Sequence, residues 1–349
     1  LALGEGRCAR VLMLTARTTG RKSAMDALAI LEAHGAKLTA VEIAAKDKVC
    51  PMEKRDCRPE VCPYAKGFYD RLPDALEEAL GGGSMGRGQV ETLANKHTLC
   101  PFELSLTLAQ TADVVVCDYN YVFDPFVAID ALMQGGAALL IDEAHQLAPR
   151  VQDNASAAVS AKQLRELRRD AGQALGRKHA LYKALTAALR ALEEAARTEE
   201  FAAGRLEKPP EDLNAAMEGL LDAAGGALAE GAGPPASDVF SLAACWQYAA
   251  GRLDERYAVL TEGAEKTARI ELFLLCAAQD ILEKTKKARG AVFFSATLAP
   301  FEAAKRMLGS LDGDACLALP SPFDKSQLDA RILPVDLRYA ARESSAPLV

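Results

Sequence analysis

Ala137-Ala138-Leu139-Leu140-Ile141-Asp142-Glu143-Ala144-His145 is the stretch of sequence that decides the fold. Its first five residues are apolar without polar alternation, which is typical of a parallel strand buried on both faces. Ligands of open α/β sheets gather at the carboxyl ends of such strands, so the acids that follow are expected at the mouth of a site. We predict that Asp142 holds the magnesium of a nucleoside triphosphate and that Glu143 activates the attacking water. The competing interpretation is that these acids only begin a helix, where they suit the helix dipole.

Four cysteines form a second signal: Cys50, Cys57, Cys62 and Cys100, separated by six, four and thirty-seven residues. Four thiolates complete the shell of a tetrahedral zinc ion or of an iron-sulfur cluster, and the spacing alone does not choose between the two. The Cys-x2-Cys knuckle that is common in zinc sites is absent, although His97 leaves open a zinc site of three cysteines and one histidine. The remaining cysteines lie mostly in apolar surroundings and are expected to be core thiols.

Two further apolar runs end in polar side chains. Val292-Phe293-Phe294 is followed by Ser295-Ala296-Thr297, and Val11-Leu12-Met13-Leu14 is followed by Thr15-Ala16-Arg17-Thr18-Thr19-Gly20-Arg21. A loop of the second kind can hold phosphates, although a helix cap followed by a solvated face would use the same residues.

In this order the pieces resemble the iron-sulfur helicases of superfamily 2, the XPD/DinG family. The resemblance rests on motif Ia (residues 14–21), the four cysteines, the DEAH box at residues 142–145 and motif III at residues 295–297. Two other stretches are similar to the family: Ala112-Asp113-Val114-Val115-Val116-Cys117-Asp118-Tyr119-Asn120-Tyr121 and Pro320-Ser321-Pro322-Phe323. The resemblance covers nearly the whole chain and implies a partial RecA-like P-loop motor domain, a parallel sheet with flanking helices.

The resemblance also implies cofactors, partners and roles. It replaces zinc by a [4Fe-4S] cluster on the four cysteines and adds ATP, magnesium and movement along single-stranded DNA in the 5′ to 3′ direction, with duplex junctions as substrates and DNA repair or replication as the setting. His145 would couple the nucleotide site to Ser295 and Thr297. Arg17 and Thr18 would contact the strand. Beyond Cys62, Tyr64 and Lys66 interleave a ring with a cation, as base stacking and phosphate contacts require, although an amphipathic helix would do the same.

No Gly-x-x-x-x-Gly-Lys-[Ser/Thr] loop occurs in the 349 residues. That loop supplies most of the grip on a triphosphate in P-loop motors. We therefore expect this sequence to be a piece of a longer protein, with the loop upstream and a second motor domain downstream, and we expect the piece alone to be inactive as an ATPase.

The breaks in pattern predict six segments. They are residues 1–45, the first part of the motor domain; 46–100, the iron-sulfur insert; 101–155, the motor domain with the DEAH strand; 156–287, a helical insert that the resemblance assigns to the Arch domain; 288–323, the motor domain with motif III; and 324–349, the start of a linker to the second motor domain. The helical assignment of residues 156–287 rests on apolar spacing in an Ala-, Leu-, Glu- and Arg-rich stretch.

Composition agrees with a globular chain and little more: 50% of the residues are hydrophobic, 26% are charged, and the net charge is −7. No run of about eighteen apolar residues predicts a membrane span. Free thiols and a metal set suit the cytoplasm. The negative charge does not favour nucleic-acid binding, but a motor needs a lined groove and not a basic surface.

Two alternative functions remain at this stage. The first is a DEAH-type RNA helicase with a zinc insert, which metal analysis and a comparison of DNA with RNA unwinding would distinguish. The second is a non-catalytic module that binds single strands or partner proteins, which the absent phosphate-binding loop favours. Nothing in the sequence identifies a protein partner.

Overall fold

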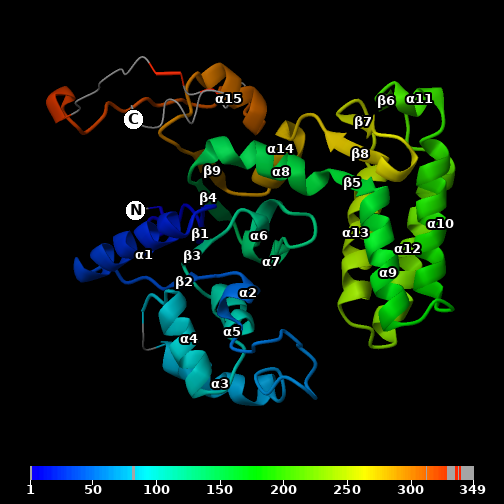
Figure 1. Cartoon of the computed structure of the whole chain (residues 1–349). Coiled ribbons are helices and arrows are strands. Elements are labelled where there is room, and N and C mark those ends of the chain that lie inside the picture. The colour runs from blue at the N-terminus through cyan, green and yellow to red at the C-terminus, as the bar shows by residue number, and fades with distance from the viewer. Residues whose placement is uncertain (1, 81–82, 312, 328–334, 337, 339–349) are drawn as a thin grey trace. The chain divides into compact units, whose positions relative to one another are not determined.

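A five-stranded parallel sheet lies at the centre of the first of two compact units of the chain, Leu1–Leu311 and Asp312–Val349 (Figure 1). The computed structural model describes residues 2–80, 83–311, 313–327, 335–336 and 338. The strand order is β2-β3-β1-β4-β9. The strands are β1 (Arg10–Leu14), β2 (Ala40–Glu42), β3 (Val114–Cys117), β4 (Ala137–Ile141) and β9 (Gly290–Phe293). The predicted α/β class is confirmed.

Both faces of this sheet are covered, which is why its strands are apolar without alternation. On one face Val114 and Val116 of β3 pack with Leu28 of helix α1 (Thr18–Ala33). On the other face Leu12 and Leu139 belong to the large core that the remaining helices share. Strand β9 is the exception, since its residues alternate between exposed and half-buried.

The segment between β2 and β3 carries the four cysteines and is mostly helical at its two ends. Its helices are α2 (Lys46–Val49), α3 (Phe68–Leu80), α4 (Arg87–Lys96) and α5 (Pro101–Ala109). Residues 50–67 contain only turns and bends. Gly81 and Gly82, between α3 and α4, lie outside the described residues.

Short helices connect β3 and β4 to the second insert and to the end of the first unit. They are α6 (Asn120–Phe123), α7 (Asp130–Met133), the 3-10 turn η1 (Ala144–Gln146), α8 (Leu147–Ala155), α14 (Ala278–Thr285) and α15 (Phe301–Leu308). Another 3-10 turn, η3 (Lys325–Gln327), lies in the second unit, where most of the predicted linker 324–349 falls outside the described residues.

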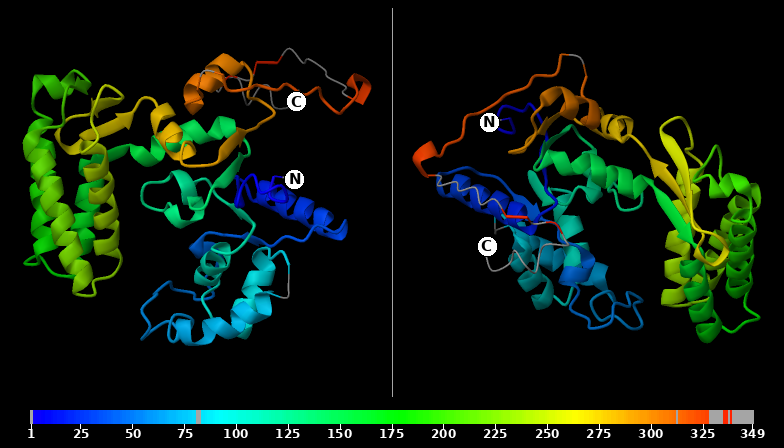
Figure 2. Two further views of the ribbon diagram at one scale, coloured as in Figure 1. Left: turned by 180° about the vertical axis from the view of Figure 1, so that it is seen from behind. Right: turned by 45° about the horizontal axis from the view of Figure 1, so that its top comes forward.

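The second insert is a helical bundle with a sheet at one end, and the four long helices lie side by side (Figures 1 and 2). Its helices are α9 (Ala161–Ala174), α10 (Ala180–Ala195), α11 (Glu199–Ala202), α12 (Glu211–Ala229) and α13 (Pro234–Ala250), with a 3-10 turn η2 (Glu265–Thr267). Its antiparallel sheet has the order β5-β8-β7-β6, formed by β5 (Ala157–Ser160), β8 (Arg269–Leu274), β7 (Tyr257–Glu262) and β6 (Arg205–Leu206).

The expectation that residues 156–287 are helical is therefore only partly right. Arg269–Leu274 alternates half-buried and buried side chains with a period of two, which is the pattern of a strand with one covered face. The surrounding Ala- and Leu-rich helices obscure this short alternation in the sequence. Trp246 lies in the bundle core, fully buried, and its indole N–H donates to Asn214 Oδ1 over 3.0 Å.

None of the helices among the described residues combines the length and the apolar character that a membrane span requires.

Candidate functional site

The carboxyl ends of β1, β4 and β9 meet at one edge of the parallel sheet and build the site. Leu14 is in register with Ile141, and Ile141 with Phe293. Beyond the strands the pairing continues, because the amide of Asp142 donates to Leu14 O over 2.9 Å and the amide of Ala144 donates to Phe294 O over 3.1 Å. The backbone thus brings together three segments that lie far apart in sequence.

Asp142 is held by the end of β1 and the first turn of α1. The Thr15 hydroxyl donates to Asp142 Oδ2 over 3.1 Å, and Thr15 is fully buried. A Cβ on Gly20 would lie 2.3 Å from Thr15 Oγ1 and 2.9 Å from Asp142 Oδ2. Only glycine therefore allows the helix to approach the carboxylate this closely.

Glu143 has a left-handed backbone, with φ 48° and ψ 44°, which is uncommon for a residue with a side chain. Its amide donates to Asp142 Oδ1 over 2.9 Å. The buried hydroxyl of Tyr119 donates to the carbonyl of Asp142 and, over 3.2 Å, to that of Glu143. Burial, reinforced by the charges of Asp142 and Glu143, holds the pKa of the Tyr119 phenol above its ordinary value, so the phenol remains a hydrogen-bond donor.

The Glu143 carboxylate is the centre of a network that reaches motif III. The Ser295 hydroxyl donates to Glu143 Oε2 over 3.3 Å and lies 2.8 Å from His145 Nδ1. Thr297 Oγ1 lies 3.3 Å from both Ser295 Oγ and His145 Nδ1. His145 Nδ1 is also 3.4 Å from Glu143 Oε2. All five residues predicted for the catalytic site therefore lie within one hydrogen-bonded group.

Arg17 is the one predicted strand-contacting residue that reaches this group. Its Nη1 lies 3.7 Å from Glu143 Oε1, while 58% of its side chain is exposed. Thr18, also exposed, begins helix α1 one residue later. Tyr64 and Lys66 lie in the irregular segment before α3, with Tyr64 half-buried and Lys66 exposed, and no contact links them to Arg17 among the described residues.

Three positions that support the site were not singled out from the sequence: Thr15, Gly20 and Tyr119. Tyr119 is completely buried, so it packs within the core and is not exposed to a bound strand. Thr15 and Tyr119 each follow a buried strand by one or two residues. A search for polar residues directly after each apolar strand of the sheet would have identified Thr15 and Tyr119 from the sequence.

Asp142 can take part in a magnesium site of the open kind. Magnesium is usually bound through one or two carboxylates, with water and substrate phosphates completing the octahedron. Both carboxylate oxygens of Asp142 accept one hydrogen bond from the protein and keep a further lone pair. In the described part of the chain no three His, Cys, Asp or Glu side chains gather closely enough to hold a metal ion by themselves.

The four predicted cluster ligands are all free thiols in one insert. Cys62 is buried, Cys57 is exposed, Cys50 follows α2 and Cys100 precedes α5. Burial raises the pKa of the Cys100 thiol. Burial lowers the pKa of Lys46, but its bond to Glu103 and the nearby charges of Glu103, Cys57 and Cys100 outweigh this and raise the pKa. The donor set suits soft metals, although the described side chains do not converge into a closed shell.

Arg71 connects the two parts of the cysteine insert. Its guanidinium donates to the carbonyls of Pro63 and Lys66, next to Cys62, and to those of His97 and Thr98, next to Cys100, over 2.7 to 3.2 Å. His97 itself pairs with Glu78, its Nε2 lying 2.9 Å from Glu78 Oε2. One nitrogen of the imidazole is therefore engaged by Glu78.

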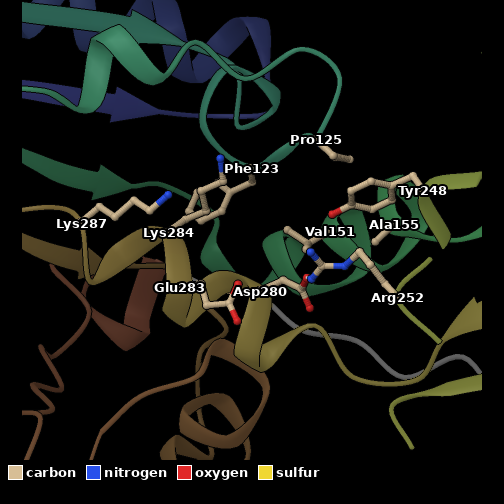
Figure 3. A pocket seen from close by; sticks show the side chains of 10 residues that line it. All are labelled: Phe123, Pro125, Val151, Ala155, Tyr248, Arg252, Asp280, Glu283, Lys284 and Lys287. Atoms are coloured by element: carbon tan, nitrogen blue, oxygen red, sulfur yellow. The ribbon is translucent and has the colours of Figure 1, made fainter. Parts of the chain in front are cut away.

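A separate hollow of about 300 Å³ lies where α6, α8, α13 and α14 meet (Figure 3). Asp280 of α14 pairs there with Arg252 at the end of α13, and its Oδ2 lies 3.0 Å from Arg256 Nη1. The Arg252 guanidinium lies over the Tyr248 ring, 5.2 Å from its centre. These contacts tie the second insert to the parallel-sheet domain, and none of the predicted site residues lines this hollow.

Comparisons with known proteins find similarity to helicases. Residues 33–164 match the DEAD_2 family. The chain is 28% identical over 102 residues to the regulator of telomere elongation helicase 1 of Homo sapiens, and 30% identical over 110 residues to that of Bos taurus. These matches span 29% and 30% of this chain but only 8% and 9% of the relatives.

A solved structure titled truncated XPD matches the fold with a TM-score of 0.51 and 14% identity, covering 86% of this chain and 85% of that one. At that identity the likeness concerns the fold alone. Residues 33–164 are therefore similar to the DEAD_2 family, and the chain shares the fold of the structure titled truncated XPD.

Proposed function

We propose that this chain is the catalytic face of an ATP-dependent DNA helicase. The observation that carries the proposal is the network in which Glu143 bonds to Ser295, and Ser295 to His145, beside an Asp142 that is fixed from β1. A carboxylate that positions water and a carboxylate that takes part in magnesium binding are the parts that phosphoryl transfer to water needs. Magnesium would neutralise charge on the phosphates.

In this proposal each side chain has one task. Glu143 accepts a proton from the attacking water, and the Ser295 hydroxyl fixes the carboxylate in position. His145 contacts both Ser295 and Thr297, so a displacement of motif III changes the surroundings of Glu143 directly. Arg17 lies beside the same carboxylate and exposes its guanidinium, so a bound strand and the nucleotide site are coupled through one ion pair.

Glu143→Gln in the full-length gene product tests the proposal. We expect nucleotide binding within about threefold of the wild type and ATP turnover lowered by at least about a hundredfold, because general-base catalysis contributes about 10²–10⁴-fold. Glu218→Gln, an exposed position of α12, is the matched control and should turn over normally. A Glu143→Gln variant with normal turnover excludes Glu143 from this role. Strand binding by a wild type without any turnover would favour the non-catalytic module.

We further propose that the enzyme moves 5′ to 3′ on single-stranded DNA, including strands at duplex junctions, and serves DNA repair or replication in the cytoplasm. The exposed Arg17 and Thr18 at the start of α1, and Tyr64 with Lys66 in the cysteine insert, offer phosphate and stacking groups. Strand displacement from DNA duplexes with a tail of either polarity decides the direction. Unwinding only from a 3′ tail, or only of RNA duplexes, would refute this part.

We also propose that Cys50, Cys57, Cys62 and Cys100 hold a [4Fe-4S] cluster. Four free thiols in one insert support this donor set. Protein prepared without oxygen should be brown and contain about four irons, and replacing any of the four by serine should remove them. Cys245→Ser is the control, since that thiol lies in the helical bundle. One zinc and no iron would establish the zinc alternative.

A further inference from the structure

We propose a second nucleic-acid contact on the helical insert, an arginine groove between α9 and α10 that binds the phosphodiester backbone of a single strand. The groove measures about 290 Å³. We name the arginine groove by its lining residues, which are Arg165, Arg168, Arg169, Gly172, Gln173, Arg177 and Tyr182. Four of these seven are arginines and none is acidic, in a chain whose net charge is −7. Positive charge is therefore concentrated at this groove, although the chain as a whole has a negative net charge.

The positions of the arginines follow from helix geometry. Arg165, Arg168, Arg169 and Gly172 are spaced by three, one and three residues, so they lie on one face of α9. Leu164 and Ala171, on the adjoining face of the helix, are fully buried in the bundle. From residue 165 to residue 173 the helix rises about 12 Å, because each residue adds about 1.5 Å. A row of that length can face several consecutive phosphates.

Two of the four guanidinium groups have carboxylate partners among the described residues. Arg165 Nη2 lies 2.5 Å from Glu193 Oε1, and Arg169 Nε lies 3.0 Å from Asp170 Oδ1. For Arg168 and Arg177 the described part of the chain provides no ion pair. Their charge is available to a ligand, and a guanidinium suits the two oxygens of a phosphate.

A glycine inside α9 gives the groove its shape. Gly172 is in the last third of the helix, where glycine costs about 1 kcal/mol relative to alanine. A Cβ at this position would lie 3.0 Å from Tyr182 Cε2 and 3.1 Å from Cδ2. The ring of Tyr182 therefore packs directly on the helix backbone, and the Arg168 guanidinium lies over it, 6.0 Å from the ring centre. This contact orients Arg168 before a ligand arrives.

A single strand is the favoured occupant because it presents phosphates in a row, which matches arginines in a row, and because the proposed function requires the enzyme to hold one. The inference rests on the proposed function for the identity of the ligand only. An acidic peptide presents carboxylates and not a row of phosphates, so it is the less favoured ligand. A vesicle presents a flat surface, which matches a concave groove poorly.

The test measures the affinity of the full-length protein for a fluorescent oligothymidine at several salt concentrations, without nucleotide. Arg168→Ala with Arg177→Ala should raise Kd about tenfold and lower the salt slope by about 1.4, since each contact to a single strand contributes about 0.7. Gly172→Ala, which changes no charge, should weaken binding at least threefold by displacing Tyr182. Arg190→Ala on α10 and Gly219→Ala on α12 are the matched controls and should bind as the wild type does.

Circular dichroism establishes that the variants are folded. If Arg190→Ala weakens binding as much as one groove arginine, or if the groove variants bind DNA normally, the inference is wrong. Polyglutamate or vesicles of anionic lipid bound more tightly than DNA, with the same dependence on Arg168 and Arg177, would overturn the choice of ligand. Failure of the proposed function is distinguishable, because it would appear as a full-length wild type without ATP turnover, whereas failure of this inference appears as unchanged DNA affinity in the groove variants.

Discussion

The position of the Glu143 carboxylate depends on an uncommon backbone conformation of the same residue. Its left-handed backbone turns the chain at the end of β4 and places its carboxylate against Ser295 of a different strand end. Such a conformation costs about 1–3 kcal/mol and persists only where the surroundings determine it. Here the hydrogen bonds from Tyr119 to the carbonyls of Asp142 and Glu143 do so.

Tyr119→Phe removes those bonds while keeping the ring. We expect the free energy of unfolding to fall by about 1–2 kcal/mol, because the Asp142 carbonyl loses the bond from Tyr119, while the Glu143 carbonyl keeps its bond from the Gln146 amide. Since burial raises the pKa of Tyr119, its contribution is present below the ordinary tyrosine pKa of about 10 and is lost as pH rises beyond it. Urea unfolding at pH 7 and pH 10.5 measures both effects. Equal stability of variant and wild type at pH 7 would show that the hydroxyl does not support the turn.

Gly20→Ala should disturb Asp142, for which we propose a role in magnesium binding. The added methyl group meets the buried Thr15 hydroxyl and the Asp142 carboxylate, so we expect a loss of about 1–3 kcal/mol by overpacking. Gly219→Ala, a helical glycine with open space around its Cβ, should instead add up to about 1 kcal/mol. Thermal unfolding of the two variants gives the comparison. A stabilising Gly20→Ala would mean that α1 does not approach the carboxylate this closely.

At the scale of elements, the cysteine insert depends on few contacts. Its irregular segment 50–67 packs little apolar surface, and Arg71 joins it to the end of α4 through four carbonyls. A metal would add order to such a segment, because binding free energy becomes folding free energy. Loss of the Arg71 contacts or of a bound metal should therefore destabilise residues 50–67 before it destabilises the parallel sheet.

Arg71→Ala tests this connection. Residues 50–67 should become cleavable by trypsin at Lys54 and Arg55 several times faster, since the local opening free energy falls by about 1–2 kcal/mol when charged hydrogen bonds are removed from a half-exposed site. Arg150→Ala, on α8 outside the insert, is the control and should leave the cleavage rate unchanged. Unchanged cleavage in Arg71→Ala would assign the order of the segment to other contacts.

At the scale of the whole molecule, stability is unevenly distributed over the first unit. Strands β1, β3 and β4 have neighbours on both sides and are covered on both faces, whereas β9 has one neighbour among the described strands and alternates exposed residues. Hydrogen exchange should show the slowest amides in β1, β3 and β4, faster ones in β9, and the fastest in residues 50–67. Exchange as slow in β9 as in β4 would contradict this order.

The sequence by itself determined the parallel sheet and which polar residues gather at its edge. Unbroken apolar runs such as residues 137–141 require burial on both faces, and the polar residues that follow them, Asp142, Glu143, Ser295 and Thr297, had to lie at one edge because parallel strands end together. Both conclusions follow from local pattern, and the structure places these side chains within hydrogen-bonding distance.

Tertiary structure alone decided the rest. The strands of the second insert are too short to stand out among alanine- and leucine-rich helices, and β5, β6 and β7 become a sheet only because distant segments pair. The hydroxyl of Tyr119, the glycine at position 20 and the glycine at position 172 have meaning only beside the atoms that approach them. Such contacts depend on distances between residues remote in sequence, which no local periodicity contains.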